Sequence, residues 1–71
     1  MSWLTPPQAA KSGRWPLGRD AIRARCEAYQ LAVSQGRRPS PDDIECVRIG
    51  SRYHIQPEAL DAWLRRQKHA A

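Results

Sequence analysis

The 71-residue sequence contains no apolar run near the length of about 20 residues that a transmembrane helix needs. Its first residues, MSWLTPPQAAKSG, also lack the charged start and apolar stretch of a secretory signal peptide. We therefore expect a cytoplasmic protein. Low-complexity tracts and internal repeats are absent as well. A length of 71 residues allows one domain at most, so we expect a single domain over residues 1–71.

Cysteine is scarce, and the usual signatures of catalysis are missing. Cys26 and Cys46 form no CxxC motif and have no paired histidines, so neither zinc nor redox spacing is present. We expect both to be reduced residues of the core. The sequence shows no paired carboxylates in an apolar setting, no phosphate-binding loop and no nucleophile beside a base. We therefore expect no enzymatic activity, no cofactor and no metal site.

Positive charge is what the sequence has in excess. Twelve Lys and Arg residues face seven Asp and Glu residues, which gives a net charge of +5 and a pI near 10.0. A basic single domain favours a polyanionic partner, either nucleic acid or an anionic membrane surface. The core must be modest, because so short a chain buries only about 60% of its unfolded surface.

Three segments carry the signals of helices. A short helix begins with the capping box Thr5-x-x-Gln8 and ends at Gly13. A second helix is predicted over residues 19–35. A third begins near the Gln-Pro pair at 56 and 57, and its basic end, residues 65–71, is predicted to fray into a tail.

The stretch VRIGSRYHI predicts two short strands around a glycine-serine turn. A two-residue turn would mix apolar and polar side chains on one face of the hairpin. An odd loop over residues 50–52 instead pairs Ile49 with Tyr53. The apolar side chains of both strands then share one buried face, and Arg48 and His54 lie on the other. We predict the odd loop and leave the turn type open.

The predicted core combines apolar stripes from the second helix, the hairpin and the last helix, none of which is stable alone. The residues predicted to be buried, besides Cys26 and Cys46, are Ile22, Tyr29, Val33, Val47, Ile49, Tyr53, Ile55, Leu60, Trp63 and Leu64. The sequence does not decide whether Trp3 and Trp15 are buried.

The order of elements points to a fold class. Two helices joined by a short turn resemble a helix-turn-helix, and a hairpin after the second helix resembles a wing. A cation at a wing tip neutralises phosphates, and Gly50 lets the backbone come close to them. The predicted fold is therefore a small α+β winged helix-turn-helix with a C-terminal helix.

Four stretches in this order, WLTPPQAA, GRDAIRARC, VRIGSRYHI and EALDAWL, resemble the excisionase family of winged-helix proteins, related to MerR-type DNA-binding domains. The resemblance covers about residues 3–65, and its N-terminal part looks most like the lambdoid phage excisionases. It implies a recombination directionality factor of a prophage or integrative element, working on the nucleoid of a bacterial or phage-infected cell. Such a protein binds repeated sites, bends attachment-site DNA and directs a tyrosine-recombinase integrase toward excision.

The sequence departs from the family pattern on the recognition helix. The acidic groove position of the family falls on Asp20, but its two outward arginines fall on Ala24 and Glu27. Arg19 and Arg23 are expected to substitute from the flank, unless specificity depends on DNA shape.

The candidate site residues fall into four groups. The recognition helix contributes Arg19, Asp20, Arg23, Ala24 and Glu27. The wing contributes Arg48, Ser51, Arg52 and His54. Contacts to the DNA backbone are predicted for Arg14, Arg37 and Arg38. A surface for a second copy or for the integrase is predicted at Leu31, Arg65, Arg66 and Lys68.

Each charged residue also has a plainer interpretation. Asp20 suits the positive end of a helix dipole, and charges on a hairpin block edge-to-edge aggregation. Two other functions stay open. One is transcriptional regulation of a phage or mobile element, which other branches of the family perform. The other is a small inhibitor or adaptor that binds proteins on the same scaffold.

Overall fold

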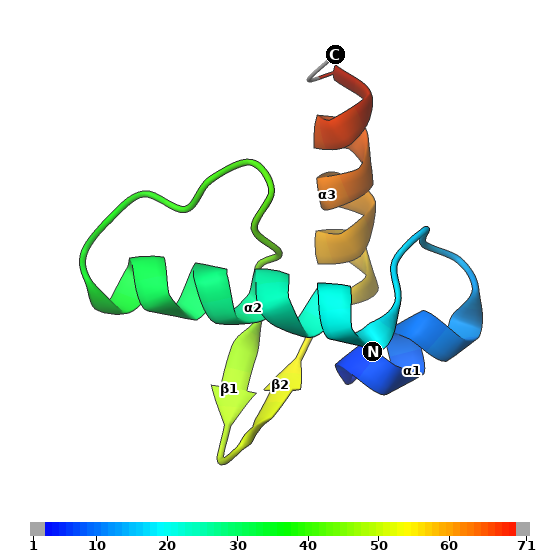
Figure 1. Ribbon diagram of the computed structural model, residues 1–71, viewed down its shortest axis with the longest axis horizontal. Helices are drawn as coiled ribbons and strands as arrows, with labels where there is room; N and C mark the ends of the chain where they lie inside the picture. Colours follow the sequence, from blue (N-terminus) through cyan, green and yellow to red (C-terminus); the bar gives the residue numbers. More distant parts are fainter. Residues whose placement is uncertain (1–2, 70–71) are drawn as a thin grey trace.

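The structure is a computed structural model that describes residues 3–69. Its elements, in order, are α1 (Pro6–Ser12), α2 (Arg19–Ser34), β1 (Val47–Ile49), β2 (Arg52–His54) and α3 (Pro57–His69). The two strands form one antiparallel hairpin. α2 lies across the molecule, α1 and the hairpin lie on one side of it, and α3 extends on the other (Figure 1). The predicted small α+β fold is confirmed.

The first two helices begin and end where the local sequence predicts. The backbone N–H of Thr5 donates to Gln8 Oε1 at 3.0 Å, which is one half of the capping box. Gly13 adopts a positive φ of 71° at the end of α1. Gly36 does the same beyond the end of α2, at a φ of 70°. In both places glycine meets a left-handed backbone at little steric cost.

The C-terminal helix is longer than predicted. Residues 65–69 were expected to fray, but α3 continues to His69. Arg66 explains part of the extension, because its Nε donates to the carbonyl of Pro41 at 3.0 Å and its Nη2 to the carbonyl of Asp43 at 2.9 Å. These bonds fasten the last turns of α3 to the loop between α2 and β1. Ala70 and Ala71, the end of the predicted tail, lie outside the described residues.

The core lies where the three helices meet the base of the hairpin. Its buried members are Ala9, Trp15, Ile22, Cys26, Ile44, Cys46, Tyr53, Ile55, Leu60 and Trp63. Tyr29 and Leu64 are only partly buried and pack against this cluster. Trp15 is therefore a core residue, whereas Trp3 is exposed.

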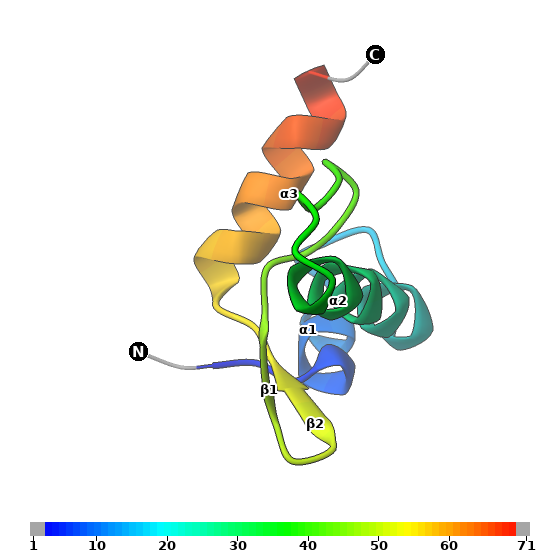
Figure 2. The same ribbon diagram turned by 90° about the vertical axis from the view of Figure 1, so that its left-hand side faces the viewer.

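Three residues predicted to be buried are exposed: Val33, Val47 and Ile49. At the end of α2 the inward position is Ala32, one residue before Val33, and a step of one residue turns a side chain by about 100°. The two strand residues are exposed because the hairpin points away from the body, as Figure 2 shows.

The register of the hairpin also differs from the prediction. Val47 pairs with His54 and Ile49 with Arg52, so the turn contains two residues, Gly50 and Ser51. Gly50 has a φ of 63°, which suits the first position of a two-residue hairpin turn. The face that mixes apolar and polar side chains is the one turned to solvent, and so the mixing costs little.

A segment outside the hairpin, at Leu4, pairs with the residue that follows the buried side of the hairpin. Tyr53 points toward the body, and Ile55, two residues later, is fully buried. Leu4 and Ile55 exchange two backbone hydrogen bonds of 2.7 Å each. Leu4 thus pairs with the residue directly after β2, a contact that the alternation of side chains within the hairpin could not reveal.

Both cysteines are free thiols in the core, as predicted. Cys46 Sγ donates to the carbonyl of Cys26 at 3.6 Å. The hydrogen bond with the Cys46 side chain and burial together raise the pKa of Cys26, which stays protonated at neutral pH. Within residues 3–69, no helix is both long and apolar enough to cross a bilayer.

Candidate nucleic-acid interface

A groove of 630 Å³ opens between the start of α1, the first turns of α2 and the tip of the hairpin. Its lining residues are Thr5, Pro6, Pro7, Arg19, Asp20, Arg23, Ser51, Arg52 and Tyr53. We call it the arginine groove. It brings together candidates from the recognition helix with candidates from the hairpin tip, about thirty positions apart in the sequence. Figures 1 and 2 show why, since α1 and the hairpin lie on the same side of α2.

The local structure explains how these side chains meet. Arg19 and Arg23 are one helical turn apart on α2, and Ile22 anchors that turn in the core. The two-residue turn places Arg52 directly after the tip. Tyr53 follows it and is buried, which fixes the start of β2 beside α2. The cations of the groove therefore come from two elements, α2 and β2, each fixed to the core by its own buried side chain.

The charges of the groove are accessible and mainly positive. Arg19, Arg23 and Arg52 face one carboxylate, that of Asp20. Arg19 Nε lies 3.7 Å from Asp20 Oδ1, with both side chains largely exposed, and a pair of that kind contributes little to stability. Within the described residues, Arg23 and Arg52 join no ion pair. Their guanidinium groups are therefore available to bind phosphates.

Other predicted residues of α2 and the hairpin lie elsewhere. A second groove, of 480 Å³, is lined by Glu27, Ala28, Gln30, Leu31, Ser34, Arg48 and Tyr53. We call it the Leu31 groove. Glu27 and Arg48 thus lie on the other side of Tyr53 from the arginine groove. Ala24 is exposed but lines neither groove, and His54 is half-buried opposite Val47.

Arg48 has a structural contact at the tip. Its Nε donates to the carbonyl of Gly50 at 3.1 Å, across the turn. This bond supports the backbone of the turn from the face that Arg48 shares with Tyr53. The side chain is therefore placed to stabilise the hairpin tip rather than to project from it.

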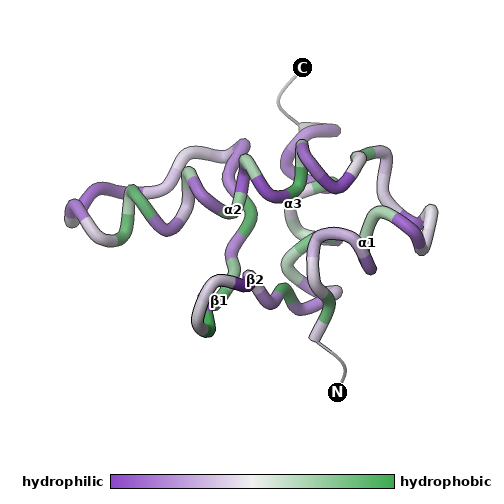
Figure 3. Tube along the Cα trace, turned by 60° about the horizontal axis from the view of Figure 1, so that its bottom comes forward, coloured by the Kyte–Doolittle hydropathy of each residue, from purple (hydrophilic) through white to green (hydrophobic). Residues whose placement is uncertain are grey.

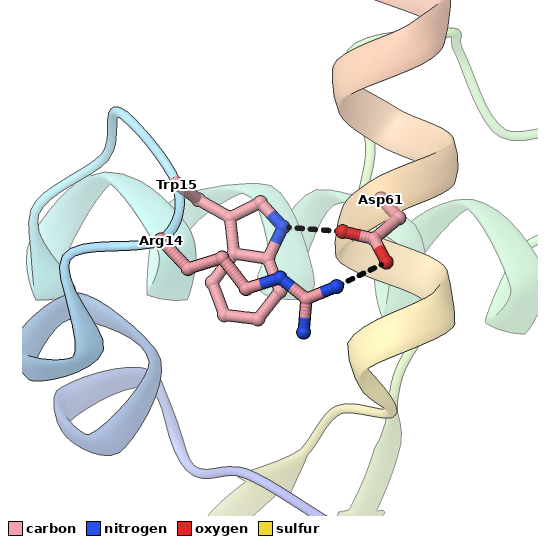
Figure 4. Close-up of polar contacts among 3 residues, drawn as sticks. All are labelled: Arg14, Trp15 and Asp61. Atoms are coloured by element: carbon pink, nitrogen blue, oxygen red, sulfur yellow. Dashed lines mark hydrogen bonds and ion pairs between the residues drawn. The ribbon is translucent and has the colours of Figure 1, made fainter.

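Arg14, predicted to contact the DNA backbone, is instead tied to α3 (Figure 4). Its Nη2 donates to Asp61 Oδ2 at 2.9 Å, and Trp15 Nε1 donates to Asp61 Oδ1 at 3.1 Å. The Arg14 guanidinium also lies 5.0 Å from the centre of the Trp15 ring. The three side chains join the turn between α1 and α2 to α3, and Arg14 does not line the arginine groove.

The remaining candidates do not share one surface. Arg37 and Arg38 are exposed in the loop after α2 and line neither of the two grooves. Leu31 is exposed, as predicted. Arg65 and Lys68 are exposed on α3, but Arg66 is engaged by the loop carbonyls described above.

The roles of four residues were not found from the sequence. Pro6 and Pro7 signal a helix start, and nothing in them shows that this start forms a wall of the arginine groove. Tyr53 lines both grooves and separates them. The alternation of apolar and polar residues along the strand predicted only that it is buried. Asp61 has no sequence signal, because its partners lie 46 and 47 positions away.

Comparison with protein-family models, with curated proteins and with solved structures finds no match to this chain. Among residues 3–69, no group of three or more His, Cys, Asp or Glu side chains is placed to hold a metal ion. The functional assignment therefore depends on the residues of the grooves themselves.

Proposed function

We propose that the chain is a winged helix-turn-helix protein that binds double-stranded DNA. α1 and α2 would form the helix-turn-helix, and the β1–β2 hairpin would be the wing. The observation that carries the proposal is the convergence of Arg19, Arg23 and Arg52 on one open groove with a single carboxylate. The first turns of α2 enter the major groove, while the wing contacts the neighbouring backbone or minor groove.

Within that class, we propose the role of an excisionase. The support is the resemblance over about residues 3–65 together with an order of helices and strands that agrees with a winged helix-turn-helix. In this role the protein binds repeated sites, bends the attachment-site DNA and directs an integrase toward excision. Arg65 and Lys68, exposed on α3, are available for the integrase.

Phosphate contacts carry most of the affinity in this proposal. Ala24 and Glu27 occupy positions where a base-reading cation is expected, and neither side chain can donate two hydrogen bonds to guanine. Asp20, highly exposed at the start of α2, can accept a hydrogen bond from the amino group of cytosine. A single copy would therefore discriminate weakly, and specificity would depend on several copies and on DNA shape.

The same DNA surface would serve a transcriptional regulator of a phage or mobile element. A gene neighbour that encodes an integrase favours the excisionase, whereas a promoter-controlled operon favours the regulator. A protein-binding inhibitor or adaptor, the third possibility, requires no affinity for DNA.

The dependence of DNA affinity on salt tests the proposal. Each neutralised phosphate contributes a slope of about −0.9 to the plot of log affinity against log salt, so three arginines predict a slope of about −3 on random-sequence duplexes. Arg52→Ala should reduce its magnitude by about one, without changing which sequences are preferred. Arg65→Ala, which removes an exposed arginine on α3, is the control and should leave the slope unchanged. A parent slope near zero would contradict DNA binding and favour the adaptor.

A further inference from the structure

Ile49 is an apolar side chain in a position that the fold does not explain. It is 63% exposed, more than any other large hydrophobic residue that the structure describes. It ends β1, directly before the turn, and pairs across the hairpin with Arg52. Figure 3 shows hydrophobic colour reaching the end of the hairpin, away from the core. Because so much of the side chain is exposed, Ile49 contributes little to the packing of the core and is free to contact a partner.

The surroundings of Ile49 make a narrow and supported tip. A Cβ added to Gly50 would meet no atom within 4 Å, so the turn stands clear of the rest of the protein. Arg48 braces the turn from the other face through its bond to the Gly50 carbonyl. Ser51 and Arg52 continue into the arginine groove. The tip therefore presents one apolar side chain next to one guanidinium, on a backbone that is held in shape.

The charge around Ile49 favours a polyanion over the hairpin of a second copy. The hairpin segment, residues 47–55, contains two arginines and one histidine but no aspartate or glutamate. Two hairpins of neighbouring copies that met at their tips would place like charges together and would desolvate them without an acidic partner. DNA supplies negative phosphates for the arginines and, between its base pairs, an apolar slot for the isoleucine.

We propose that Ile49 is a wedge that enters the minor groove and partly unstacks one base step, kinking the duplex. The inference rests on the proposed DNA binding and extends it to the residue that bends the DNA. Apolar side chains inserted between base steps in this way kink DNA by about 20–90° toward the major groove. Arg52, which pairs with Ile49 across the hairpin, binds the adjacent phosphate backbone, and flexible pyrimidine–purine steps are the expected points of insertion.

The matched variants are Ile49→Ser and Val47→Ser. Val47 lies on the same exposed face, two residues further from the tip, and is 45% exposed. Both changes remove apolar surface that contributes little to folding, so both proteins should melt near the parent. The DNA is a duplex enriched by the parent from a random library and labelled at its ends with a donor and an acceptor dye. A second set of these duplexes carries 2-aminopurine at successive steps to report unstacking.

The parent should bring the duplex ends together and raise 2-aminopurine fluorescence at one step. Ile49→Ser should lose most of the bend and of this signal and bind about tenfold more weakly, with the salt slope kept because its phosphate contacts are intact. A mismatch at the reporting step, which reduces the cost of unstacking, should restore most of the affinity of Ile49→Ser. Val47→Ser should behave as the parent.

Bending and unstacking by Ile49→Ser at the parental level would overturn the wedge and leave the proposal of DNA binding intact. Equal losses in Ile49→Ser and Val47→Ser would also overturn it, because they would point to the whole exposed face. A parent that shows no salt-dependent binding would overturn both proposals together.

Discussion

The two halves of α2 differ in how they are held and in what they expose. In the first half, Ile22 and Cys26 are fully buried, and the outer side presents Arg19 and Arg23 to the arginine groove. The second half, from Glu27 onward, buries only Ala32 and exposes Leu31 and Val33. One helix thus provides a basic surface on an anchored half and an apolar surface on a half that extends beyond the body.

The contacts behind each half account for this difference. The first half packs against α1 and α3, and the guanidinium of Arg25 lies 5.5 Å from the centre of the Trp63 ring on α3. The second half is tied to the chain before β1 by Gln30, whose Nε2 donates to the carbonyl of Cys46 at 2.7 Å. Apolar packing can fix the direction of a charged side chain, which a groove for phosphates requires. The second half of α2 therefore keeps exposed apolar side chains, Leu31 and Val33, that a partner could cover.

Truncation of one side chain in each half should give the largest difference. Ile22→Ala removes a fully buried side chain from the first half and should reduce the free energy of unfolding by about 2–5 kcal/mol, since it leaves a cavity. Leu31→Ala, in the second half, removes a side chain that is 52% exposed and should change stability by about 0.5 kcal/mol or less. Urea denaturation followed by circular dichroism measures both. Equal losses would show that the second half is packed as firmly as the first.

The sequence predicts what is decided locally. Thr5, Gln8 and Gly13 locate α1, because capping bonds join residues a few positions apart. Helical spacing alone predicted that Arg19 and Arg23 lie on the same flank of the second helix, and they do share a groove. A period of one turn is enough to show which side chains lie together.

The failures of prediction arise where a distant segment decides the outcome. Parity favoured a buried face with Val47 and Ile49, but the pairing of Leu4 with Ile55 covers a different part of the hairpin. Arg14 looked free in the sequence, yet its partner Asp61 lies 47 positions further along. No local pattern encodes either contact.

Asp61 offers an intermediate test, because it secures the turn in front of the first half of α2. Asp61→Ala removes the acceptor of Trp15 Nε1 as well as that of Arg14 and should cost about 1–2 kcal/mol of stability. Asp61→Asn keeps a carbonyl oxygen for Trp15 and loses only a largely exposed ion pair, so it should cost clearly less. Thermal and urea melts distinguish the two variants. The same cost for both would show that the ion pair, and not the indole bond, secures the turn.

The smallest expected effect concerns the second half of α2 and a neighbouring copy on DNA. We expect the Leu31 groove to contact that copy, which would favour filling of the adjacent site by about fivefold, a modest coupling. Leu31→Glu should abolish the preference on a two-site duplex and leave the affinity for one site nearly unchanged. Gln35→Glu, which adds the same charge just beyond the helix and outside that groove, controls for repulsion by DNA. Titrations of one-site and two-site duplexes provide the measurement. If the parent fills both sites with equal affinity, the copies bind independently, and a regulator acting as separate monomers explains the exposed half of α2 better than cooperative loading does.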